Sequence, residues 1–191
     1  GGGGNSGAPY RSDFVERFNR STAAVGISGW KIQYWSATGT SVASTATLPA
    51  GSTIAAGGRF LIKEADGANT AATPLPTPDA TGTAAMSSSG ARVYLLDSTG
   101  STVDLLGWGS ATASEGAPAG STSNTTSVAR ANPCIDTDVN AADFTVGAPT
   151  PQNSSTPTVV CGDTPPDPVN EPERSPRSRA LLISLPSTAG R

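Results

Sequence analysis

The sequence predicts an all-β fold in which short strands pack as a sandwich. Gly, Ser, Thr, Ala and Pro are abundant and aromatic residues make up only 5% of the chain, a composition that suits strands and turns better than helices. Two segments, 12–34 and 91–108, carry apolar residues in an alternating pattern on both sides of a polar turn. A chain of 191 residues is long enough for one good core.

The first two strands are expected at 12–19 and 29–36. The alternation in the first segment is typical of a half-buried strand, and the polar residues 19–22 form the turn that follows it. Apolar residues in these two strands are predicted to be core, namely Val15, Trp30, Ile32 and Tyr34.

Further strands are expected at 40–48, 59–63 and 128–131. The segments 91–96 and 102–108 form a hairpin around the tight turn at 97–100. Four apolar residues of this hairpin are predicted to be core, namely Val93, Leu95, Val103 and Leu105. The proline-rich segment 65–82 and the Ser/Thr-rich segment 110–127 are predicted to be loops.

The composition changes near Pro149, where prolines crowd in and a mixed-charge run follows. We therefore predict a domain over 1–160 and a Pro-rich, mixed-charge linker or disordered tail over 161–191.

Charge and residue usage disfavour several classes of function. The formal net charge is −3, so there is no basic surplus for generic nucleic-acid binding. No apolar run approaches the roughly 20 residues that span a bilayer, so no membrane span is expected. The chain has no histidine, which removes Ser-His-Asp and Cys-His nucleophilic systems. We expect this chain to have no catalytic residues and not to be an enzyme.

The cysteines Cys134 and Cys161 are the only two in the chain. Such a pair in a polar, loop-rich chain fits one disulfide of an extracellular protein better than a metal site. The alternative is a pair of free thiols. We therefore expect a secreted, extracellular protein.

Asp136, Asp138 and Asn140 place oxygen ligands at alternate positions, as in the first half of an EF-hand loop, and such ligands suit Ca²⁺. The pattern departs from that loop at Ala141 and Gly147. The alternative is a surface turn in which these side chains cap local amides. Calcium is the one cofactor that the sequence suggests.

Three aromatic residues, Trp30, Tyr34 and Trp108, could form a platform for stacking a sugar ring. Aromatic residues at strand spacing are more often part of a core, which is the interpretation we prefer.

These motifs together resemble the lamin-tail domain, an immunoglobulin-like β-sandwich. The segments that carry the resemblance are Ser12–Tyr34, Leu48–Gly58, Ser89–Gly100 and Val103–Asp104. Four further runs are similar to lamin-tail modules of secreted actinobacterial proteins, which are often joined to an endonuclease/exonuclease/phosphatase domain. They are Gly1–Glu16, Thr73–Gly82, Ser123–Ser127 and Asp136–Phe144.

The resemblance covers residues 1–155 and implies a non-catalytic accessory or interaction module, with adhesion or targeting as its role and a protein or cell-surface ligand as its partner. One alternative is a fragment of a secreted nuclease or phosphatase whose catalytic domain lies downstream. Another is a carbohydrate-binding sandwich.

Two features depart from the pattern of the family. In the family, a glycine-rich run such as 1–7 usually follows a first strand, so we expect that this strand is missing here and that a sheet edge is left open. Arg17 lies on the same strand face as Val15, where an apolar residue is usual. A buried charge there is costly, so either the guanidinium reaches solvent along its stem or the strand packs less well.

Overall fold

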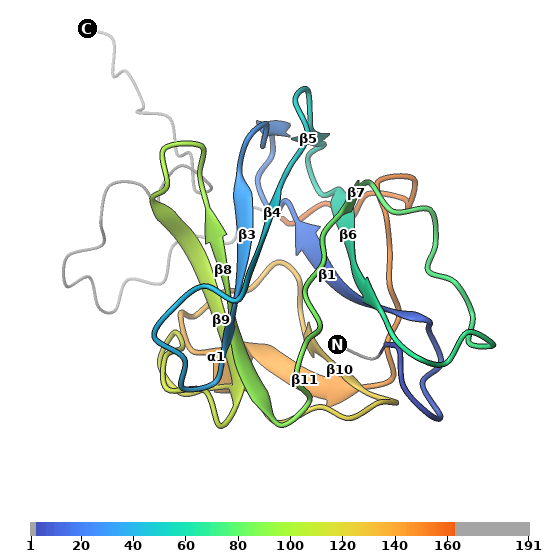
Figure 1. The fold of residues 1–191 in the computed structure, drawn as a ribbon. Coiled ribbons are helices and arrows are strands. Elements are labelled where there is room, and N and C mark those ends of the chain that lie inside the picture. Colours follow the sequence, from blue (N-terminus) through green and yellow to red (C-terminus); the bar gives the residue numbers. More distant parts are fainter. Residues whose placement is uncertain (1–2, 163–191) are drawn as a thin grey trace, which may run out of the picture.

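The computed structural model describes residues 3–162, which form a two-layered β-sandwich (Figure 1). Of the tail predicted at 161–191, residues 163–191 lie outside the described residues, whereas Cys161 is bonded to Cys134. In the described part, no helix is long and apolar enough to cross a membrane.

The first layer is an antiparallel sheet with the strand order β4-β3-β8-β9. Its strands are β3 (Lys31–Ser36), β4 (Ser44–Thr47), β8 (Gly90–Leu96) and β9 (Thr102–Gly109). The turn between β8 and β9 is closed by Asp97, whose carboxylate accepts hydrogen bonds from the Thr99 and Ser101 amides. The hairpin expected at 91–108 is therefore confirmed.

The second layer has the order β1-β6-β7, with β1 (Ser12–Phe18), β6 (Arg59–Asp66) and β7 (Ala80–Thr81). β1 runs antiparallel to β6, and β7 runs parallel to it. The two residues of β7 fall within the segment 65–82 that was expected to be loop. Two short strands, β2 (Val25–Gly26) and β5 (Thr53–Ile54), form a small antiparallel ladder. β2 lies in the connection from β1 to β3, and β5 lies in the connection from β4 to β6.

The chain then forms a hairpin of β10 (Ser127–Arg130) and β11 (Phe144–Gly147). A short helix, α1 (Asn140–Asp143), directly precedes β11. The expected strand at 128–131 corresponds to β10, whereas its partner β11 was not predicted.

The core lies between the two layers and is apolar. Ile32, Tyr34, Val93 and Leu95 are buried in it, together with Trp108. Val15, Trp30 and Val103 are partly buried and pack against this core. Burial of Tyr34 and Trp108 removes the proposed sugar platform of Trp30, Tyr34 and Trp108.

Leu105 is a correction, because it is half-buried and lies outside the core. The register between β8 and β9 shifts at one point, where Leu95 pairs with Asp104 and Leu96 pairs with Thr102. The extra residue in β9 is Val103, and such a bulge reverses which side chains face inward. Leu106 therefore packs on the core instead of Leu105.

Arg17 faces the core side of β1, since it pairs with the buried Phe60. Its guanidinium donates to the Asp104 carboxylate of the opposite sheet at 2.5 Å. Both side chains are about one-fifth exposed, at 20% and 18%. The charge is therefore neither at the solvent surface nor a packing defect, because it has a partner in the other layer.

The outer face of the β1-β6-β7 sheet is covered by the first part, 149–154, of the extended segment 148–162. Leu61 points away from the core, since Ile62 faces it, and yet Leu61 is fully buried. The Gln152 amide donates to Oε2 of Glu16, which pairs with Leu61 across the sheet, at 2.8 Å. Pro149 and Pro151 are also buried. This segment completes the second layer of the domain.

Candidate functional site

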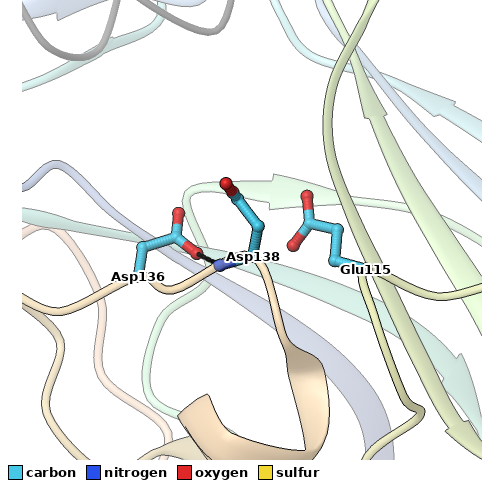
Figure 2. Close-up of side chains that lie close together, drawn as sticks. All are labelled: Glu115, Asp136 and Asp138. Atoms are coloured by element: carbon cyan, nitrogen blue, oxygen red, sulfur yellow. Dashed lines mark hydrogen bonds between the residues drawn. The ribbon is translucent and has the colours of Figure 1, made fainter. Parts of the chain in front are cut away.

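Three carboxylates meet where the loop after β9 approaches the connection between β10 and α1 (Figure 2). They belong to Glu115, Asp136 and Asp138, and one oxygen from each lies within 4.8 Å of the others. Two of the three predicted ligands, Asp136 and Asp138, are thus brought together. Glu115 was missed, because it stands alone in a Ser/Gly-rich loop and no local spacing links it to the other two.

The backbone around Asp138 explains how the two aspartates turn toward one another. Asp138 has a φ of 56°, a left-handed conformation that aspartate tolerates better than most residues. Its amide donates to Oδ1 of Asp136 at 3.3 Å (Figure 2). The local-capping alternative considered for this turn therefore describes this pair of residues.

Asn140 is the third predicted ligand, and the alternative of a surface turn would also leave it exposed, which is wrong. It is fully buried. Its Oδ1 accepts from the Gly107 amide at 2.8 Å, and its Nδ2 donates to the Leu105 carbonyl at 3.1 Å and to Glu115 at 3.3 Å. The oxygen that would hold a cation is already bonded to β9.

Asn140 and Glu115 together close the outer edge of β9. The Leu105 amide donates to Oε1 of Glu115 at 3.3 Å, while the Asn140 side chain pairs with Leu105 and Gly107 as a neighbouring strand would. Further along, Gly109 and Ala119 continue the ladder through backbone bonds. Buried backbone groups need such partners, which accounts for the burial of Asn140.

Two arginines neutralise part of the acidic cluster. Arg20 and Arg130 each lie 3.2 Å from an oxygen of Asp136. Arg130 also pairs with the buried Asp143 at 3.0 Å and stacks 4.6 Å from the ring centre of Phe144. The Asp136 carboxylate therefore already forms ion pairs with two arginine side chains.

The ionisation of Glu115 is set by its surroundings. Burial, and then the negative charges of Asp104 and Asp136, raise the pKa of Glu115 to about 8. The effect on Asp143 is opposite, since hydrogen bonds from Thr137 and the charge of Arg130 outweigh burial and lower its pKa. At neutral pH the cluster holds Glu115 largely as the neutral acid.

This arrangement has the chemistry of a weak site for a hard cation. Carboxylate oxygens suit Ca²⁺. A cation at Glu115, Asp136 and Asp138 would have to displace the proton of Glu115 and compete with the two arginines for Asp136. The residues that could hold calcium are therefore Glu115, Asp136 and Asp138, without Asn140.

A second acidic pair is formed by Asp13 of β1 and Glu64 of β6. Burial raises the pKa of both carboxyl groups. Each accepts a backbone hydrogen bond at 2.8 Å, Asp13 from Met86 and Glu64 from Ala84. Both acids thus hold the segment that leads into β8.

The disulfide between Cys134 and Cys161 is confirmed, with 5.3 Å between the two Cα atoms. It joins the connection that carries Asp136 to the end of the 148–162 segment.

The model of the Lamin Tail Domain family matches residues 1–110. The chain belongs to this family. The two layers described above agree with the immunoglobulin-like sandwich of a lamin tail domain. No curated protein matches the chain.

The matched part of the lamin tail domain contains β1 to β9. Glu115, the β10–β11 hairpin, the disulfide and the 148–162 segment lie beyond it. The acidic cluster is therefore built from residues outside the part that identifies the family.

Proposed function

We propose that this lamin tail domain is a non-catalytic interaction module of a secreted bacterial protein, with a role in adhesion or targeting. Membership of the lamin-tail family is the observation that carries the proposal. The Cys134–Cys161 disulfide supports an oxidising, extracellular location. The partner is a protein or a cell-surface ligand.

The non-catalytic part of the proposal is tested with the purified, oxidised 191-residue chain. The chain is incubated with DNA, RNA and a phosphate ester in Mg²⁺ or Ca²⁺, and we expect no turnover. Turnover that survives repurification and falls in a Glu115→Gln variant would refute it. If the reading frame continues past Arg191 into a His- and Asp-rich domain, the activity of the parent protein belongs to that domain.

One observation favours a carbohydrate as the cell-surface ligand. Trp35 and Tyr94 lie on the outer face of the β4-β3-β8-β9 sheet, with ring centroids 5.9 Å apart and planes inclined by 59°. Both side chains are half-buried, and the Arg92 guanidinium lies 5.4 Å from the Trp35 ring centre. Aromatic rings at a surface can stack on sugar rings through their apolar faces.

The carbohydrate candidate is tested by sedimentation with insoluble bacterial cell-wall polysaccharide. Wild-type protein should co-sediment and Tyr94→Ala should not, whereas Thr45→Ala on the exposed edge strand should bind as wild type does. Equal sedimentation of Tyr94→Ala and wild type would exclude this face. Protein-mediated adhesion would then remain the leading role.

The calcium expectation stays a prediction, and we propose Glu115, Asp136 and Asp138 as its ligands. Its support is the convergence of three carboxylates from two loops.

A further inference from the structure

The extended segment that follows β11 divides into two parts that are held in different ways. We name residues 149–154 the proximal strap and residues 155–161 the distal strap. The proximal strap crosses the outer face of the β1-β6-β7 sheet, and the distal strap continues to the disulfide at Cys161.

The proximal strap is anchored by side-chain burial and by hydrogen bonds to two carboxylates. Pro149 and Pro151 are buried, and the Gln152 amide donates to Glu16 at 2.8 Å. The Ser154 amide donates at 3.0 Å to Oδ2 of Asp79, and the Ser154 hydroxyl donates to the other oxygen. Oδ2 of Asp79 also accepts a hydrogen bond from the Leu61 amide of β6 at 2.7 Å, so this anchor is connected to the sheet.

The distal strap has far less to hold it. Within the residues that the structure describes, its single hydrogen bond to the sandwich runs from the Val159 amide to the Gly57 carbonyl at 2.8 Å. Val159 is 41% exposed and Val160 is 85% exposed. One backbone hydrogen bond does not offset the conformational entropy lost by ordering seven residues.

The contact at Gly57 also depends on the absence of a side chain. Gly57 has a φ of +63°, and a Cβ there would overlap the Val159 carbonyl. The distal strap thus rests on backbone alone at this point, without apolar burial to retain it.

We propose that the Cys134–Cys161 disulfide is a redox latch that holds the distal strap on the domain. A dithiol reductant releases the distal strap and leaves the proximal strap and the sandwich in place. Both cysteines are only half-buried, so a small dithiol can reach the bond.

The exchange is balanced with the dithiol as the reductant. One of its thiolates attacks a protein sulfur, a mixed disulfide forms, and the other cysteine leaves as a thiolate that takes up a proton. The second thiol of the reagent then closes a cyclic disulfide and frees the remaining cysteine. Two electrons pass to the protein, which gains two thiols.

Release frees residues 155–161. With the bond intact, Cys161 is held beside Cys134. With the bond reduced, the strap is held only as far as Ser154, and Cys161 can then lie up to about 25 Å from Ser154.

Hydrogen exchange of individual amides in the full 191-residue chain tests the proposal. The oxidised protein is compared with protein reduced by a 1,4-dithiol and with the double variant Cys134→Ser/Cys161→Ser. Compared with the oxidised protein, the Val159 amide should exchange at least about tenfold faster both in the dithiol-reduced protein and in the double variant. The Gln152 and Ser154 amides should change by less than about twofold, which provides the internal control.

Two results would overturn the latch. An unchanged rate at Val159 in the double variant would mean that non-covalent contacts hold the distal strap. Equal acceleration at Val159, Gln152 and Ser154 would mean that the bond secures the whole strap. Thiol titration of the dithiol-treated protein decides accessibility, because a bond that survives treatment of the folded protein would contradict its role as a redox latch.

Discussion

Replacing Arg17 by methionine tests the ion pair that links the two sheets. Met keeps most of the apolar stem but removes the charge, so Asp104 is left without its 2.5 Å partner between the layers. Removing one member of a fully buried pair costs about 3–5 kcal/mol. Both side chains here are about one-fifth exposed, and Arg130 also attracts Asp104. We therefore expect a loss of about 2–3 kcal/mol in the free energy of unfolding.

Urea denaturation and thermal melting at pH 7 measure this loss. For a domain of this size, it corresponds to a fall of about 4–12 °C in Tm. The matched control is Lys63→Met, which breaks the exposed pair with Asp66 and should cost less than about 0.5 kcal/mol. The double variant Arg17→Met/Asp104→Leu should recover to within about 1 kcal/mol of wild type, because no charge is then left unpaired.

The pH dependence gives an independent check. Burial alone would raise the pKa of Asp104, but the charge and hydrogen bond of Arg17 lower it overall, below the usual 3.8. The contribution of the pair is therefore present above that pH and is lost as pH falls through the lowered pKa. Equal stability of Arg17→Met and the Lys63→Met control at pH 7 would show that the Arg17–Asp104 pair does not stabilise the domain.

Three further predictions concern the acidic cluster. The pKa of Glu115 is raised to about 8, so the free energy of unfolding should fall as pH rises from about 4.5 to 8. The fall should be about 1–2 kcal/mol after solvent screening. In Glu115→Gln, the corresponding decrease of Tm with pH should be smaller. Asn140→Ala should lower the free energy of unfolding in urea by about 2–4 kcal/mol, because it leaves backbone groups of β9 unpaired. Its control is the exposed Asn132→Ala, which should lower this free energy by less than about 1 kcal/mol. Millimolar CaCl₂ at pH 8.5 should raise the wild-type Tm but not that of Asp138→Ala; equal shifts would exclude this site.

Local sequence patterns were sufficient to predict the hairpin at 91–108 and the disulfide. The hairpin at 91–108 follows from its alternating residues and the tight turn at 97–100, and both appear in the structure. The disulfide follows from a lone cysteine pair in a chain rich in loops. The facing of Leu105 could not be predicted, because the bulge at Val103 reverses the alternation and no turn residue marks it.

The candidate site depended on contacts that are distant in sequence. Glu115 is 21 residues before Asp136, and only folding brings their carboxylates together. Asn140 fits an oxygen-ligand spacing, but its amide is used by the edge of β9, which a local pattern cannot show. For Arg17, the sequence raised the problem of a charge on a core face, and the answer lay 87 residues away at Asp104.

The two edges of the first sheet differ, because side chains bond the backbone of edge strand β9. On one side, a side-chain amide and a carboxyl group occupy the backbone groups that another molecule would need in order to add a strand. On the other side, in the described residues, β4 ends the sheet as a four-residue strand with exposed threonines. Edge strands are templates for association between chains. Assembly of this domain by strand pairing in the first sheet is therefore directed to β4, and growth of a continuous sheet through both edges is blocked.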